Sequence, residues 1–157
     1  MLDPAVIAAT LAELGQPAYR ARQVYEALTR GLVTDFDAVT TLPLALRRAL
    51  RARLSPLSLT ERETRVAPDG TARKTLFATA DGHPVEAVLM QVAGRATVCV
   101  STQVGCAVGC SFCMTGRGGL ERQLGSAEIV AQVALARRLR AVTKVVLMGM
   151  GEPAHNL

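Results

Sequence analysis

Tryptophan is absent from the 157-residue sequence, and aromatic residues make up only 3% of it. Any core must therefore be aliphatic, and a hydrophobic content of 50% is sufficient to form one. No apolar run reaches the roughly 18 residues that a membrane span needs. The start, Met1-Leu2-Asp3-Pro4, lacks the basic residues of a secretory signal. We therefore expect a soluble, cytoplasmic protein with no membrane partner.

Acidic residues are outnumbered by basic ones, 13 to 18, which gives a formal net charge of +5. This excess favours an anionic partner, and nucleic acid is the first candidate. The basic residues concentrate in two clusters, Arg47, Arg48, Arg51 and Arg53, and then Arg137, Arg138, Arg140 and Lys144. Such clusters can neutralise phosphates, but many charge runs are only solvated faces.

Residues 1–57 have a helical pattern. Apolar residues recur at helical spacing in three segments, which begin near Pro4, Arg20 and Pro43. We expect the inward side chains to be Val6, Ile7, Leu11 and Leu14, then Val24, Ala27 and Leu28, then Leu46, Ala49, Leu50 and Leu54. The pattern predicts a small helical accessory domain.

Residues 58–92 change to a period of two. Two predicted strands, Lys74–Thr79 and Val85–Met90, flank the turn residues Asp81-Gly82. Pro68-Asp69-Gly70 marks another turn before the first of these strands. The pattern predicts a β-hairpin extension.

Residues 93–157 are predicted to form strand, loop, helix and strand, which is the βαβ unit of an α/β fold. The strands are expected at Thr97–Val104 and Lys144–Gly149. The helix is expected to begin at Ser126 as N-cap, with Glu128 in its first turn. Its apolar arc would contain Ile129, Val130, Val133 and Ala136. One such unit leaves sheet edges unpaired, so we expect an incomplete domain.

Four cysteines, Cys99, Cys106, Cys110 and Cys113, lie within 15 residues. A secreted scaffold would spread its cysteines along the chain, so this crowding indicates a metal or redox site. The last three form a Cys-x-x-x-Cys-x-x-Cys pattern. Their thiolates can bind three irons of a 4Fe–4S cluster and leave the fourth iron open.

Zinc is the alternative metal. A zinc site would need a fourth Cys or His, commonly from a second Cys-x-x-Cys pair. Here His83 and His155 are distant in sequence, and Cys99 lies seven residues before Cys106. The spacing therefore favours the cluster.

A second motif, Gly149-Met150-Gly151-Glu152-Pro153, follows the last predicted strand. Its glycines permit close backbone approach, and a carboxylate beside carbonyl groups can pair with an ammonium group. The motif is weak alone, and its position after the cysteine loop strengthens it.

Together these motifs resemble a known family. Cys-x-x-x-Cys-x-x-Cys after a first strand resembles the signature of radical S-adenosylmethionine enzymes, and Gly149–Pro153 resembles their glycine–glutamate motif. Residues 99–119 resemble RlmN-type methyltransferases nearly residue by residue, and residues 16–25 resemble their helical N-terminal module. Met114 departs from the Ser or Ala more usual there. The resemblance covers about the first half of a family member and implies a truncated radical S-adenosylmethionine (β/α) barrel.

This resemblance implies methylation of adenine C2 in 23S rRNA, with tRNA as a second substrate. It implies a 4Fe–4S cluster on Cys106, Cys110 and Cys113, and S-adenosylmethionine at Gly151 and Glu152. A cysteine in the C-terminal half, absent here, would carry the methyl group and form a covalent adduct with the RNA. The resemblance further implies an electron donor such as flavodoxin and a monomeric state.

Two more residues match family positions. Cys99 matches the cysteine that resolves the adduct and closes a disulfide, and Glu86 matches the proton acceptor. Independently, a period of two places Cys99 with Ser101 and Gln103, opposite Val98, Val100 and Val104. The alternatives are that Cys99 is a small buried hydrophobe and that Glu86 is a solvated strand residue.

Two other functions stay open. A Cfr-type relative would methylate adenine C8 with the same parts. Alternatively, the chain is an inactive truncated fragment that binds a cluster or RNA.

Overall fold

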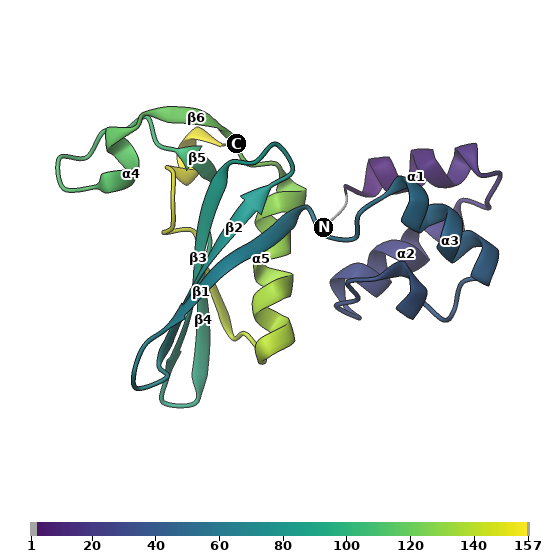
Figure 1. Cartoon of the computed structure of the whole chain (residues 1–157), viewed down its shortest axis with the longest axis horizontal. Helices are drawn as coiled ribbons and strands as arrows, with labels where there is room; N and C mark the ends of the chain where they lie inside the picture. The colour runs from purple at the N-terminus through teal and green to yellow at the C-terminus, as the bar shows by residue number, and fades with distance from the viewer. Residues whose placement is uncertain (1–2, 157) are drawn as a thin grey trace. The chain divides into compact units, whose positions relative to one another are not determined.

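The computed structural model describes residues 3–156, and it divides into two compact units between Ser58 and Leu59 (Figure 1). Met1 and Leu2, which contribute to the expectation about the N-terminus, lie outside the described residues. No helix among residues 3–156 is long and apolar enough to cross a membrane.

The first unit contains the three predicted helices, α1 (Pro4–Glu13), α2 (Tyr19–Thr29) and α3 (Leu44–Arg53), and a short helix η1 (Phe36–Ala38). Their apolar stripes meet in a core that includes Ile7, Leu11, Val24, Leu28, Phe36, Leu46 and Leu50. The prediction that Val6 points inward is wrong, because its side chain is 46% exposed. Adjacent residues of a helix point about 100° apart, so Val6 lies away from the stripe that Ile7 and Leu11 share.

The second unit is built on a five-stranded sheet in the order β1-β2-β3-β4-β7. The strands are β1 (Leu59–Val66), β2 (Ala72–Thr79), β3 (Pro84–Val92), β4 (Arg95–Cys99) and β7 (Lys144–Val146). The predicted hairpin is confirmed as the antiparallel pair β2–β3. The first four strands are antiparallel neighbours, whereas β7 runs parallel to β4.

Helix α5 (Ser126–Leu139) connects back to β7 and packs along one face of this sheet (Figure 1). The βαβ unit is thereby confirmed, with Leu89, Ala96, Val98, Val100 and Ala136 buried between sheet and helix. The N-cap is Gly125 rather than the predicted Ser126. The Glu128 carboxylate accepts a hydrogen bond from the Gly125 N–H at 2.9 Å, which gives the backbone donor of the N-cap residue a partner. Val130 is 38% exposed, so its predicted place in the apolar arc is wrong.

The strand predicted at Thr97–Val104 is divided in two. β4 ends at Cys99, and β5 (Gln103–Gly105) joins a separate two-stranded sheet with β6 (Leu120–Gln123). The cysteine loop, defined as residues 106–119, lies between β5 and β6 and contains the short helix α4 (Met114–Arg117). A one-turn helix, η2 (Pro153–His155), follows β7.

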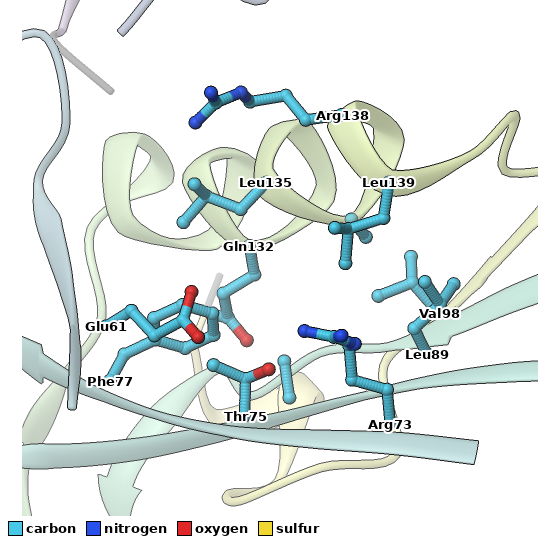
Figure 2. Close-up of a pocket in the computed structure, with 12 residues that line it drawn as sticks. Glu61, Arg73, Thr75, Phe77, Leu89, Val98, Gln132, Leu135, Arg138 and Leu139 are labelled. Atoms are coloured by element: carbon cyan, nitrogen blue, oxygen red, sulfur yellow. The ribbon is translucent and has the colours of Figure 1, made fainter. Parts of the chain in front are cut away.

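A cavity of about 230 Å³ lies between the sheet and α5 (Figure 2). Its walls include Phe77, Leu89 and Val98 from the strands and Leu135 from the helix. Ala87 and Val98 line this cavity, so their strand neighbours Glu86 and Cys99 lie on the opposite face of the sheet.

Candidate functional site

The cysteine loop begins and ends at one point. The Cys106 N–H donates a hydrogen bond to the Gly119 carbonyl at 2.8 Å, beside the antiparallel β5–β6 pair. Gly105 has φ of +75°, and a Cβ atom there would lie 2.0 Å from the Gly119 oxygen. Only glycine therefore fits at the closure of the loop.

Within the loop, Cys113 precedes α4 and its N–H donates to the Cys110 carbonyl at 3.0 Å. The backbone N–H groups of Gly116 and Thr115, together with the Thr115 hydroxyl, lower the pKa of the Cys113 thiol. Donors at a helix start favour the thiolate, which is the form that binds metals.

All four cysteines are free thiols; Cys110 is exposed, and Cys99, Cys106 and Cys113 are half-buried. Among residues 3–156 no three Cys, His, Asp or Glu side chains are gathered closely enough to hold a metal ion. The loop therefore presents the three thiols of the motif without assembling them into a ligand set. Their assignment as cluster ligands stays a prediction.

The segment Gly149–Glu152 packs directly on residues 100–103. The Gly149 N–H donates to the Val100 carbonyl at 3.1 Å. A Cβ at Gly149 would lie 2.7 Å from the Ser101 hydroxyl oxygen, and a Cβ at Gly151, where φ is +98°, would lie 2.5 Å from the Gln103 Cβ. The glycines thus permit a close approach, as predicted, but what they approach in this structure is the chain at residues 100–103.

Ser101 and Gln103 are completely buried, and they bind the backbone of this segment. The Ser101 hydroxyl accepts from the Met150 N–H at 2.8 Å and donates to the Glu86 carbonyl at 2.6 Å. The Gln103 Oε1 accepts from the Glu152 N–H at 2.8 Å. Sequence reasoning assigned no role to these two residues, although their alternation with valines was the available signal.

Glu86 and Cys99 lie on the same face of the sheet. Val88 pairs with Cys99 across β3 and β4, and Glu86 is two residues from Val88, so all three share a face. The Glu86 carboxylate accepts from the Lys74 ammonium at 2.9 Å. Burial raises the pKa of the Cys99 thiol, and the Met148 N–H opposes this shift. The structure therefore brings these two predicted residues together on the face opposite α5.

The predicted cofactor residues Gly151 and Glu152 lie at the end of the same sheet. The Glu152 side chain accepts from the Ala154 N–H at 3.0 Å and so caps η2. Asn156, just after η2, is anchored to the rest of the unit, because its side-chain amide donates to the carbonyls of Thr102 at 2.6 Å and Leu124 at 2.9 Å.

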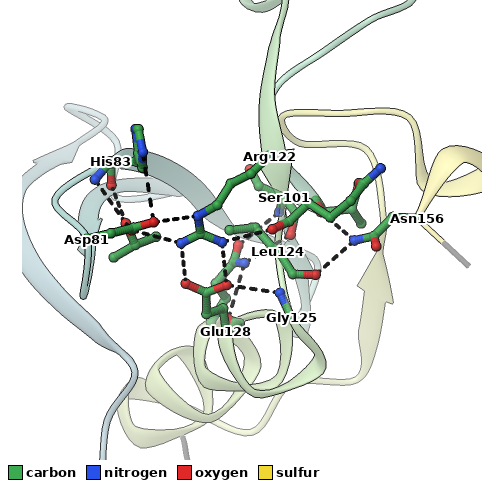
Figure 3. A network of polar contacts seen from close by, with 12 residues as sticks. Asp81, His83, Ser101, Arg122, Leu124, Gly125, Glu128 and Asn156 are labelled. Atoms are coloured by element: carbon green, nitrogen blue, oxygen red, sulfur yellow. Dashed lines mark hydrogen bonds and ion pairs between the residues drawn. The ribbon is translucent and has the colours of Figure 1, made fainter.

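A polar network beside the loop was not foreseen (Figure 3). Arg122 of β6 contacts Asp81, in the β2–β3 turn, and Glu128 of α5. Hydrogen bonds from Arg122 and then Thr79 hold the pKa of Asp81 well below its usual value. Burial would raise the pKa of Glu128, but hydrogen bonds from Arg122 and the Gly125 N–H outweigh it and lower that pKa.

The basic cluster of α3 is partly occupied by contacts within the unit. Arg51 is ion-paired with Asp37, Arg47 donates to the Asp37 carbonyl at 2.7 Å, and Arg53 pairs with Glu13 at 3.2 Å. Arg48 is exposed and has no ion pair among the described residues. Arg137, Arg138, Arg140 and Lys144 are also exposed.

Comparison with known proteins adds independent evidence. No protein-family model matches the chain. It is 66% identical over 118 residues to a "probable RNA methyltransferase" of Methylibium petroleiphilum, covering 74% of this chain and 32% of that protein. It is 46% identical over 154 residues to a "probable dual-specificity RNA methyltransferase RlmN" of a Nocardioides species, covering 92% of this chain and 41% of that protein.

A solved structure gives the same result. The crystal structure of a radical S-adenosylmethionine methyltransferase from Sphaerobacter thermophilus matches with a TM-score of 0.89 and 50% identity. The match covers 99% of this chain and 47% of that one, and it confirms the predicted α/β class as part of a larger fold. The chain is therefore a homologue of the RlmN-type radical S-adenosylmethionine RNA methyltransferases and spans less than half of their length.

Proposed function

We propose that this chain carries the cofactor-binding part of a radical S-adenosylmethionine enzyme that methylates adenine C2 in 23S rRNA, with tRNA as a second substrate. The main support is one structural observation: β4 and β7 are parallel neighbours, so the segments that lead from them to the cysteine loop and to Gly149–Glu152 leave the same end of the five-stranded sheet. Gln103, in the strand before the loop, donates a hydrogen bond to Gln123, in the strand after it, and accepts one from the Glu152 N–H. The names of the homologues support RNA as the substrate class.

In this proposal, Cys106, Cys110 and Cys113 hold a 4Fe–4S cluster, and Gly151 and Glu152 bind the amino-acid part of S-adenosylmethionine. The donor chemistry fits, since three thiolates on one loop suit such a cluster and leave one iron open. The lowered pKa of the Cys113 thiol also favours metal binding. When bound, the cluster supplies the electron that cleaves the cofactor.

Glu86 and Cys99 act on the RNA side of the reaction. Glu86 accepts the proton that leaves adenine C2, which requires a base, and Lys74 anchors its carboxylate at 2.9 Å. Cys99 resolves the enzyme–RNA adduct with a cysteine outside this chain. Their common sheet face supports this division of roles. A flavodoxin-type electron donor, a cytoplasmic location and a monomeric state complete the proposal.

Anaerobic reconstitution with iron and sulfide tests the cluster. Wild-type chain should gain about four irons and the broad visible absorbance of a 4Fe–4S centre. Replacing Cys106, Cys110 or Cys113 by Ala should abolish that absorbance. Cys99→Ala is the matched control and should retain it, because Cys99 lies in β4 outside the loop. One zinc ion bound per chain, with all four thiols required, would overturn the proposal.

The position of the methyl group is tested on RNA. Mass spectrometry of nucleosides from RNA modified by an enzyme containing this chain separates methylation at C2 from the Cfr-type alternative at C8. The second candidate function is a cluster- or RNA-binding piece without methyltransferase activity. Cluster binding without methyl transfer to rRNA by the chain alone would support that candidate.

A further inference from the structure

Gln103 is a polar side chain with no exposed surface. Burying an amide costs free energy unless its oxygen and its nitrogen both find partners. Both do: Oε1 accepts from the Glu152 N–H at 2.8 Å, and Nε2 donates to Gln123 Oε1 at 2.9 Å. A side chain that only filled space here would be apolar.

The orientation of the Gln103 amide follows from its partners. A backbone N–H can only donate, so Glu152 must face the amide oxygen. Gln123 is oriented in the same way, because its Nε2 donates to the His155 carbonyl at 2.7 Å and leaves its oxygen for Gln103. The two glutamines therefore form a directed chain in which hydrogen bonds are donated from Glu152 to Gln103, from Gln103 to Gln123 and from Gln123 to the His155 carbonyl.

This chain joins two parts of the molecule that the sequence separates. Gln103 lies in β5, three residues before Cys106, and Gln123 closes β6 after the cysteine loop. Glu152 lies 49 residues beyond Gln103. Gly151 also packs against Gln103, since a Cβ on Gly151 would lie 2.5 Å from the Gln103 Cβ. One side chain, Gln103, thus links the base of the cysteine loop to residues 149–152, called the Glu152 turn below, and holds them at a fixed separation.

We propose that Gln103 is a positioning residue, which fixes the Glu152 turn relative to the cysteine loop so that one cofactor molecule can contact both. The inference rests on the proposed function, because it assigns the loop to the cluster and Glu152 to S-adenosylmethionine. It goes beyond that function by naming the residue that sets the distance between the two half-sites.

Amide hydrogen exchange of the isolated chain, followed by NMR, tests the positioning directly. Gln103→Met keeps the shape of the side chain but removes both hydrogen bonds, and should speed exchange of the Glu152 N–H about tenfold. Gln103→Glu keeps an acceptor for that N–H and should retain its protection. Gln91→Met is the matched control, since Gln91 is a half-buried glutamine of β3, in the five-stranded sheet, and its side chain has no hydrogen bond among the described residues.

Two results would overturn the inference. One is unchanged exchange at Glu152 in Gln103→Met. The other is equal loss of protection in Gln103→Glu, because general packing rather than the acceptor would then be responsible. If Gln103→Met fails to fold, Gln103→Glu alone decides the question, through protection of the Glu152 N–H.

A second measurement separates this inference from the proposed function. In reduced, reconstituted chain, the electron paramagnetic resonance signal of the cluster should change when S-adenosylmethionine is added. The S-adenosylmethionine concentration that produces half of this signal change should rise about tenfold in Gln103→Met and stay the same in Gln91→Met. If the wild-type signal does not change when S-adenosylmethionine is added, the proposed cofactor site is refuted, whereas the result of the hydrogen-exchange test is unaffected. An identical response of wild type and Gln103→Met would refute the role of Gln103 alone.

Discussion

Arg122 donates hydrogen bonds to both carboxylate oxygens of Asp81, at 2.7 Å from Nε and 2.9 Å from Nη2, although 41 positions separate the two residues. The same guanidinium contacts both oxygens of Glu128 at 2.8 and 3.0 Å. One cation therefore ties β6, at the base of the cysteine loop, to the β2–β3 turn and to the start of α5 (Figure 3).

This network should make the stability of the chain sensitive to acid. The pKa values of Asp81 and Glu128 are lower in the folded chain than their usual values. The unfolded chain therefore binds more protons in acid, so the stabilisation is complete above the unfolded pKa values of about 4 and is lost as the pH falls through the folded ones. Urea unfolding between pH 7 and pH 3 should show a shallower acid loss for Arg122→Met than for wild type.

The matched control for Arg122 is Arg65, which forms an exposed pair with Glu63 at 2.7 Å. Exposed pairs contribute little, so Arg65→Met should keep the wild-type pH profile. Equal acid sensitivity of Arg122→Met and wild type would contradict the assignment of this network as the source of the effect.

Gln132 should be among the least replaceable residues of α5. It is buried, its Oε1 accepts from the Ser101 N–H at 2.8 Å, and its Nε2 donates to the Ser101 carbonyl at 3.0 Å. Gln132→Leu leaves two buried backbone groups unpaired, which should lower the free energy of unfolding by about 2–4 kcal/mol. Urea denaturation measures this change, and Gln91→Leu, at a half-buried position, should change stability by less than about 1 kcal/mol. Similar losses in both variants would contradict the argument.

The sequence predicted those parts of the fold that local patterns encode. Helical spacing located α1, α2 and α3, and the Asp81-Gly82 turn located the hairpin β2–β3. It did not reveal β1, because this edge strand has one buried apolar residue, Leu59, and a bulge between Glu61 and Glu63 breaks its alternation. An exposed edge strand leaves little hydrophobic signal.

For the site, motif spacing identified the loop and the glycine segment but not the residues that hold them. The predicted strand through Cys99 is interrupted because the Gln132 side chain, from α5, takes both backbone groups of Ser101. Arg122 and Gln103 bind partners that are 41 and 49 residues away. Contacts at such separations depend on the folded topology, which a periodic pattern does not specify.

Gly151 should not tolerate even a methyl group. Its φ is +98°, a conformation that L side chains rarely adopt, and a Cβ would meet the Gln103 Cβ at 2.5 Å. Gly151→Ala should therefore lower the free energy of unfolding by about 1–3 kcal/mol, measured by urea denaturation. Gly118→Ala is the control, because a Cβ there meets nothing within 4 Å. A Gly151→Ala chain as stable as Gly118→Ala would show that the segment can move away from the strand.

The α3 arginines should differ in their contributions to RNA binding. Arg51 is ion-paired with Asp37, whereas Arg48 is exposed and unpaired in the part of the chain that the structure describes. Arg48→Ala should therefore weaken binding to a 23S rRNA fragment and reduce the slope of log affinity against log salt by about one. Arg51→Ala should have a smaller effect, because Asp37 already neutralises part of its charge.

Fluorescence anisotropy at several salt concentrations measures both changes, and Asp37→Ala supplies the decisive comparison. It removes the anion beside Arg51, so it should tighten RNA binding if this cluster contacts phosphates. Unchanged affinity in both Arg48→Ala and Asp37→Ala would mean that the cluster is a solvated face. RNA would then have to be bound by the exposed cations at the end of α5, Arg137, Arg138 and Arg140, or by residues outside this chain.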